Sequence, residues 1–456
     1  MKIFAFLQKD RVKDIFLKCL VWIVQIGLGG VLLLSGFSKL ADPYGFYYKL
    51  VEYARVWHIW YLEDSFPLLT GLFSAFEFTL GGNILFGNSK KQTSRLLFYF
   101  LIVMTIFSIY LYVKKPVEHC GCFGELWKVS AGGNLLKNFF LLGGAFYFYR
   151  YNERFHSLFT TALQWFIEIF LFFFATLSCW FFWNYGPLVE TQPFKEGIHI
   201  FQSMNAVSKE DSEIYSTTLI YEKEGKEEEF TLENYPYGDT SYHYVRTITK
   251  LLKKGSNSTI EPFEIINEEG KEVTEELLTY EGYSFLLIVP HFYASSKDNI
   301  DQLNLLYDYC VQHQYPFHCI TASNEREVEV WHYSTGSDYP IYFSDETTLR
   351  SMLRSTSGII LLKDGIIVDK ISINYLSFGE EEDLEKDLDV SLLPYFRWNP
   401  TEKSKLFLWV LFILVPLLLI FLFEKTTLLI VWTIRLAVRK IMRRKGDAQK
   451  EEVERK

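Results

Sequence analysis

Six apolar runs divide the chain, and each is long enough, or nearly long enough, to cross a bilayer as a helix. They lie at about 19–38, 66–87, 96–113, 133–150, 158–183 and 405–423. A bilayer core about 30 Å thick takes roughly 20 helical residues, and hydrocarbon leaves a non-helical backbone without hydrogen-bond partners. The pattern therefore predicts a membrane α-helical bundle, with four helices in residues 1–157, a fifth at 158–183 and a sixth at 405–423.

The interval between the fifth and sixth runs is polar and follows a different pattern. Residues 184–259 contain short alternating runs and are expected to form a β-rich region. Within residues 260–395, expected strands at 285–289, 317–321 and 341–343 alternate with helices near 298–313, 324–334 and 346–354. The segment ends in a hairpin around Lys363-Asp364-Gly365. Such alternation predicts an α/β domain, and its order resembles the thioredoxin fold.

The active-site residues of a thioredoxin are missing from this domain. A thioredoxin carries Cys-x-x-Cys directly after its first core strand and a cis-proline before its hairpin. Here residues 290–296 contain no cysteine, and Ser357 occupies the proline position. We therefore expect the domain to be inert in thiol exchange and to bind or position a partner. Cys310 and Cys319 are expected to be buried small residues, with a disulfide between them as the alternative.

Charge divides the chain in the same way as hydropathy. Residues 184–404 hold 39 Asp and Glu against 18 Lys and Arg, a net charge of −21 in a chain whose total is −9. This balance argues against nucleic acid as a partner. Basic residues gather before the first run, between the second and third, between the fourth and fifth, and in the tail 424–456. Basic flanks mark the cytoplasmic side.

This charge pattern predicts a multi-pass protein of the bacterial inner membrane with both termini in the cytoplasm. The 41–65 loop, the 114–132 loop and residues 184–404 are then periplasmic. The first apolar run ends in Ser38-Lys39-Leu40, without a small-residue cleavage site. We therefore expect it to be a retained helix rather than a signal peptide.

Two cysteines one residue apart, Cys120 and Cys122, stand in the 114–132 loop. This spacing can reach disulfide geometry, and a bond closing so small a loop tends to be labile, which suits transfer. His119 could stabilise a thiolate. The alternative is a tight glycine turn with two inert thiols. No further Cys or His stands nearby at zinc spacing, so no metal site is expected.

Two further residues are candidates to support the pair. Glu77 lies inside the second apolar run, where a carboxylate is costly and indicates function or a buried partner. It could relay a proton or bond a quinone carbonyl, or it could make a structural bond, for instance to Lys39. Cys179, near the outer end of the fifth run, could be a resolving thiol for the pair or a packing residue.

Several motifs in the first third of the chain resemble the DoxX/MauE-type membrane proteins. The segment from Ser35 to Pro43 closes the first helix as in that family, and Glu77 followed by Leu80-Gly81-Gly82 matches its second helix. The Cys-Gly-Cys-Phe-Gly run from Cys120 resembles its paired-cysteine motif. The resemblance covers roughly residues 15–150. It implies redox work at a membrane, either disulfide formation in partner proteins or electron exchange with quinone.

These observations favour a membrane thiol–disulfide or quinone oxidoreductase whose catalytic residues are Cys120 and Cys122. The expected partners are the lipid bilayer, a periplasmic or membrane protein and, as the candidate cofactor, a membrane quinone. The alternative is a non-enzymatic scaffold or assembly subunit of an envelope complex that binds partners through the inert thioredoxin-like domain. A transporter has less support, because no inverted repeat is evident.

Overall fold

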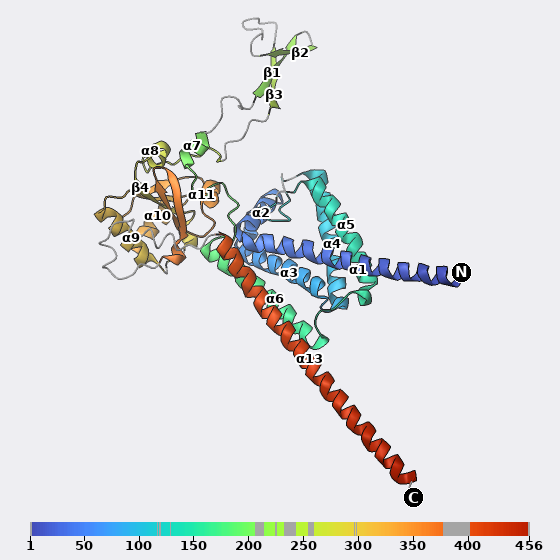
Figure 1. Cartoon of the computed structure of the whole chain (residues 1–456). Helices are drawn as coiled ribbons and strands as arrows, with labels where there is room; N and C mark the ends of the chain where they lie inside the picture. The colour runs from blue at the N-terminus through green and yellow to red at the C-terminus, as the bar shows by residue number, and fades with distance from the viewer. Residues whose placement is uncertain are drawn as a thin grey trace. The chain divides into compact units, whose positions relative to one another are not determined.

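The chain folds into two compact units, Met1–Thr191 with Trp398–Lys456, and Gln192–Arg397 (Figure 1). The computed structural model describes residues 2–115, 117, 120–127, 129–205, 214–223, 226–231, 243–253, 260–295, 297, 299–376 and 402–454. Each unit is described by itself below.

The first unit is a membrane helical bundle, as predicted. Its long helices are α1 (Lys2–Ala41), α3 (Phe66–Phe86), α4 (Lys90–Lys114), α5 (Ala131–Arg150), α6 (Thr161–Tyr185) and α13 (Glu402–Glu454). Five segments of the described residues are long and apolar enough to cross a bilayer: Ile15–Ala41, Phe66–Phe86, Lys90–Lys114, Thr161–Tyr185 and Lys403–Met442. These five correspond to five of the six predicted runs.

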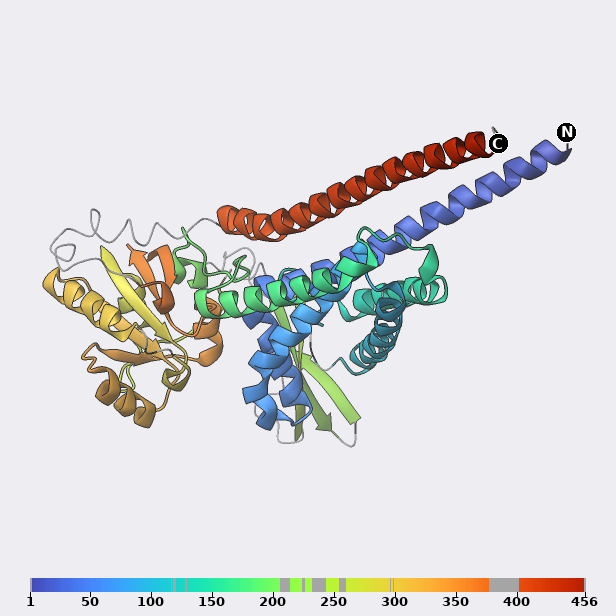
Figure 2. The same cartoon turned by 90° about the horizontal axis from the view of Figure 1, so that it is seen from below.

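Two of the predicted runs form helices that differ in hydropathy or length from a single apolar span. The run at 133–150 forms α5, but α5 is not among the five apolar spans, because Asn134, Lys137 and Asn138 lower its hydropathy. It packs against α4 in a shared apolar cluster. The last run does not end at 423, because α13 continues as one helix (Figure 2). Its candidate span of 40 residues is about 60 Å long at 1.5 Å per residue, longer than a bilayer core.

The predicted 41–65 loop is also mostly helical. It forms α2 (Pro43–Val56) and the short 3₁₀ helix η1 (Trp60–Ser65). Asp42 caps α2 by accepting a hydrogen bond from the Gly45 backbone N–H at 3.0 Å, and Pro43 occupies the first turn. An Asp-Pro pair at a helix start is a favourable capping sequence. The helix escaped prediction because its aromatic and polar residues do not form an apolar run.

Glycines bring α1 and α3 into backbone contact. A Cβ on Gly36 would overlap the backbone of Phe78, and a Cβ on Gly81 would overlap the backbone of Leu33. Small residues allow transmembrane helices to approach this closely. The close approach also places Lys39 of α1 beside Glu77 of α3.

Replacing Gly36 with alanine is expected to destabilise the bundle by about 1–3 kcal/mol, because the added methyl group pushes α1 and α3 apart. A Cβ added at Gly30 of the same helix would have nothing within 4 Å, so G30A is the matched control and should be at least as stable as the parent. Thermal unfolding in detergent micelles measures both. Equal melting temperatures for the two variants would contradict the close approach.

The second unit contains the α/β domain, and its sheet has the thioredoxin-like order expected. The strands β4 (Tyr283–Val289), β5 (Phe317–Thr321), β6 (Ile341–Phe343), β7 (Gly358–Lys363) and β8 (Ile366–Ser372) lie in the order β6-β5-β4-β7-β8. The pairs β4–β5 and β5–β6 are parallel, whereas β4–β7 and β7–β8 are antiparallel. The predicted hairpin turn is present, with positive φ at Asp364 and Gly365, as a tight hairpin requires.

Both faces of this sheet are covered. Alternate residues of β4 point to opposite faces, so Phe285 and Leu287 join one core with α9 (Ile300–Gln312) and α10 (Glu325–Thr335). Leu286 and Ile288 join the other core with α7 (Ile200–Asn205), α8 (Thr274–Leu278) and α11 (Glu346–Met352).

Three earlier strands, β1 (Ile214–Lys223), β2 (Lys226–Thr231) and β3 (His243–Lys253), form a separate antiparallel sheet. The strand order is β2-β1-β3, so the first strand is central. This sheet lies within the region predicted to be β-rich. The remaining residues of 206–259 lie outside the described part of the chain.

Candidate thiol site in the membrane bundle

The two candidate cysteines lie in a turn between α4 and α5. Gly121 has φ of +64° and Gly124 has φ of +53°, a region that glycine adopts without steric cost. The Gly124 N–H donates to the Gly121 carbonyl at 3.0 Å. Cys120 and Cys122 are both buried free thiols. The glycines therefore fold the segment so tightly that both thiols face inward.

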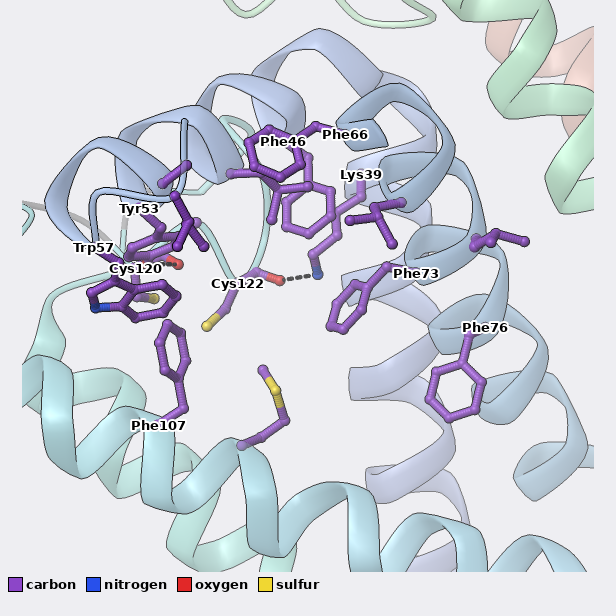
Figure 3. Close-up of a pocket in the computed structure, with 17 residues that line it drawn as sticks. Lys39, Phe46, Tyr53, Trp57, Phe66, Phe73, Phe76, Phe107, Cys120 and Cys122 are labelled. Carbon is purple, nitrogen blue, oxygen red and sulfur yellow. Dashed lines mark hydrogen bonds between the residues drawn. The ribbon is translucent and has the colours of Figure 1, made fainter. Parts of the chain in front are cut away.

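Separate helices hold the backbone at each cysteine. The Tyr53 hydroxyl of α2 donates to the Cys120 carbonyl at 2.9 Å. Lys39 Nζ of α1 donates to the Cys122 carbonyl at 2.6 Å (Figure 3). Burial raises the pKa of Tyr53, so its hydroxyl remains a donor. Both carbonyls are thus fixed on either side of Gly121.

Glu77 makes a buried ion pair with Lys39. Lys39 Nζ lies 2.5 Å from Glu77 Oε2, and both residues are at most 3% exposed. Ser35 Oγ lies 2.9 Å from the same carboxylate oxygen and 2.7 Å from the Cys122 carbonyl. Charges in such a place must be paired to be tolerated. Three roles were considered for Glu77: a proton relay, a bond to a quinone carbonyl and a structural bond to Lys39. The bond to Lys39 is present in the structure.

A cavity of about 480 Å³ adjoins the thiols. Figure 3 shows the Cys122 sulfur and several aromatic rings around it. The lining residues are Lys39, Phe46, Leu50, Tyr53, Ala54, Trp57, Ile59, Phe66, Leu69, Leu72, Phe73, Phe76, Met104, Phe107, Cys120, Gly121 and Cys122. A mostly apolar cavity with a few polar groups is typical of a small-molecule site. Its aromatic walls fit a flat, lipid-soluble ring, and Lys39 contributes a positive charge to the wall.

The two thiols differ in acidity. The Cys122 thiol donates a hydrogen bond to the Cys120 sulfur and lowers the pKa of Cys120 to about 6, against the effect of burial. Lys137 and Lys39 favour the thiolate further. The same hydrogen bond and burial raise the pKa of Cys122. The pair therefore holds one thiolate and one thiol near neutral pH, which is the reactive form of a dithiol.

Lys137 is a cation at this site that the sequence did not assign to it. Its Nζ lies 4.6 Å from the centre of the ring of Phe123, the residue directly after Cys122 in the chain. In the sequence, the feature that could have indicated this role is the position of Lys137 in the first turns of α5, next to Asn138. His119, which was expected to stabilise the thiolate, lies outside the described residues.

The remaining cysteines lie elsewhere. Cys179 is buried on α6 in the cluster around Phe78 and Leu171, and it does not line the cavity. The structure therefore does not bring Cys179 to the thiol pair. Cys310 and Cys319 are free thiols in the core of the α/β domain, where burial raises the pKa of each.

Hydroxyl groups occupy the place of the thioredoxin active site in the α/β domain. Ser295, shortly after β4, donates to Ser357 Oγ at 2.9 Å, and both side chains are buried. Ser357 stands directly before β7. Two serines cannot exchange electrons as a dithiol does.

Comparison with known proteins identifies two segments. Residues 17–150 match the family model of methylamine utilisation protein MauE, which confirms that part of the expected resemblance. Residues 215–254 match a domain of unknown function (DUF8463). No curated protein sequence matches the chain. A similar solved structure is the solution structure of a putative protein disulfide isomerase from Bacteroides thetaiotaomicron, with 17% identity over 30% of this chain and 87% of that chain and a TM-score of 0.23.

Proposed function

We propose that this membrane protein oxidises a partner protein by thiol–disulfide exchange at Cys120 and Cys122 and passes the electrons to a membrane quinone. The observation that carries the proposal is the position of two buried free thiols in the wall of an aromatic cavity. The match of residues 17–150 to a membrane family is consistent with it. In this scheme the thiol loop faces the periplasm, where oxidants are present.

The exchange step follows from the chemistry of the pair. A partner thiolate attacks the Cys120–Cys122 disulfide, forms a mixed disulfide, and releases one cysteine as a thiolate. A second partner thiol then displaces the other cysteine, so the partner becomes oxidised and the pair reduced. A low thiol pKa makes Cys120 the better leaving group. The partner is therefore expected to be joined transiently to Cys122.

The cavity supplies the site for the second half of the cycle. Its aromatic residues would hold a quinone ring. The positive charge of Lys39 would attract a quinone carbonyl oxygen and so orient the ring beside the thiols, which donate the electrons. A quinone, when bound, accepts two electrons and two protons. The residues of the chain place the thiols at this site and exclude water from it.

Replacing both cysteines with serine is expected to reduce partner oxidation to background, because no sulfur remains to form the mixed disulfide. C120S alone also leaves the pair without a disulfide to transfer, while its Cys122 can still form a reducible mixed disulfide by attacking the disulfide of an oxidised partner, with release of a partner thiolate. Acid-quenched membranes run on non-reducing gels measure both effects. C179S is the matched control and should behave as the parent. Unchanged oxidation in the double variant, with no trapped species in C120S, would exclude the proposal.

The scaffold alternative rests on the α/β domain, which has no cysteine in residues 290–296, where a thioredoxin carries its dithiol. A pure scaffold would bind its partners equally well without Cys120 and Cys122. The double serine variant separates the two functions, because a scaffold retains both its partners and their oxidation state.

A further inference from the structure

Lys39 is the one cationic side chain among the described residues that line the cavity. It is 1% exposed. Its Nζ is held by the Glu77 carboxylate at 2.5 Å, the Cys122 carbonyl at 2.6 Å and Ser35 Oγ at 2.9 Å. It also lies 5.3 Å from the centre of the Phe46 ring and 5.7 Å from that of Phe73. A cation thus stands where an acceptor would meet the thiols.

The oxidation of the pair leaves one proton unaccounted for. A thiolate and a thiol that form a disulfide release two electrons and a single proton, the one from Cys122. A quinone that becomes a hydroquinone takes up two electrons and two protons. A second proton donor is therefore required at the cavity, whose walls are mostly apolar side chains.

We propose that Lys39 is a catalytic residue that donates the second proton to the two-electron acceptor bound in this cavity, an inference that rests on the function proposed above. One proton comes from the Cys122 thiol, whose sulfur bonds to Cys120 as two electrons leave. The other comes from the Lys39 ammonium, which becomes a neutral amine and is protonated again after the reduced acceptor has left the cavity. Atoms, electrons and charge then balance.

The other polar groups are less suitable. Glu77 does not line the cavity, and its carboxylate accepts from Lys39 and Ser35. Burial raises the pKa of Tyr53, which makes its hydroxyl a weaker acid, and this hydroxyl already donates to the Cys120 carbonyl. An ammonium next to a carboxylate keeps a proton ready without leaving an unpaired buried charge. Glu77 is accordingly a positioning residue for Lys39.

A role in positioning alone must be distinguished, because Lys39 also holds the Cys122 carbonyl. Arginine keeps the positive charge but does not release a proton in proteins. K39R therefore removes proton donation and retains the charge, whereas K39M removes both. The double variant K39M/E77L removes both members of the ion pair, so no unpaired carboxylate is left buried to cause misfolding. Lys49, on α2 beside Gly121 and outside the cavity lining, supplies the matched control K49M.

Three measurements on the purified full chain separate the roles. Oxidation of the reduced pair by decylubiquinone in a single turnover reports the acceptor step. Reduction of 4,4′-dithiodipyridine without quinone reports the thiols alone. Quenching of Trp57 fluorescence by decylubiquinone, with W57F as the blank, reports binding, since Trp57 lines the cavity.

We expect K39R, K39M and K39M/E77L each to slow the quinone step by about 100-fold, the scale of a general acid. In K39R, which keeps the charge that favours the Cys120 thiolate, dithiodipyridine reduction and Trp57 quenching should change little, and K49M should resemble the parent throughout. A K39R variant with the parental quinone rate would overturn the inference while the proposed function stands. So would an equal loss in the dithiodipyridine reaction, which indicates positioning only. A parent chain that reduces dithiodipyridine but not decylubiquinone would refute the acceptor half of the proposed function, and this inference with it.

Discussion

Replacing Glu77 with leucine is expected to lower the free energy of unfolding of the bundle by about 3–5 kcal/mol, because the Lys39 ammonium is left buried without its counter-charge. Lys39 is 1% exposed and Glu77 3%, so neither reaches water without a change in helix packing. The lost bond also frees Ser35 and loosens the hold on the Cys122 carbonyl. Unfolding monitored in detergent micelles measures the loss.

The double variant makes this prediction specific. K39M/E77L removes both charges and fills their space with apolar side chains, and replacement of a buried ion pair in this way is often neutral or stabilising. We therefore expect it to recover most of the stability that E77L loses. An E77L variant as stable as the parent, or a double variant as unstable as E77L, would show that the pair is not isolated from water.

Long apolar runs were sufficient to predict the membrane bundle, because spanning a bilayer requires length and composition rather than a particular packing. The same criterion predicted α5, although α5 is less apolar than the other long helices, because its Asn134 and Asn138 bond to Ser108 of α4. Polar residues that pair between helices lower the hydropathy of a segment. The criterion missed α2, which is specified by its cap and not by an apolar run.

The hairpin and alternating elements of the α/β domain were predictable for local reasons. Asp364-Gly365 supplies a turn with two positive φ angles, and each helix repeats its apolar residues with helical spacing. The Ser295–Ser357 contact could be placed only approximately, since it joins segments 62 residues apart in sequence. It follows from the sheet order rather than from any local pattern.

The thiol site was recognisable in part. Cys120 and Cys122 form a local motif, and both stand out in a chain with six cysteines. Their cavity and their contact with Lys39 depend on the approach of α1, α3 and the thiol turn, which no local pattern encodes. Lys39 was foreseen only as a bond to Glu77. Because Lys39 also lines the cavity, its ammonium group is a candidate proton source.

Loss of the Cys122 hydrogen bond is expected to raise the pH at which Cys120 becomes reactive by more than one unit. In the parent the pKa of Cys120 lies at about 6, so its alkylation rate should rise through that pH and level off above it, where the thiolate predominates. C122A removes the donor, and the thiol then remains protonated to higher pH. A shift of one unit means about a tenfold smaller thiolate-to-thiol ratio at a given pH below the midpoint.

A matched variant isolates the hydrogen bond from the other effects of the substitution. C122S retains a hydroxyl donor at the same position, so Cys120 should titrate close to the parental midpoint, whereas C122A should not. The rate of iodoacetamide modification at each pH, followed for the Cys120 peptide by mass spectrometry, gives both midpoints. K137M should shift the midpoint upward by less than C122A, because the charge of Lys137 contributes less than the hydrogen bond. Identical midpoints for the parent, C122A and C122S would mean that Cys122 does not donate a hydrogen bond to Cys120. The difference in pKa between the two thiols, which makes Cys120 the better leaving group, would then have no support.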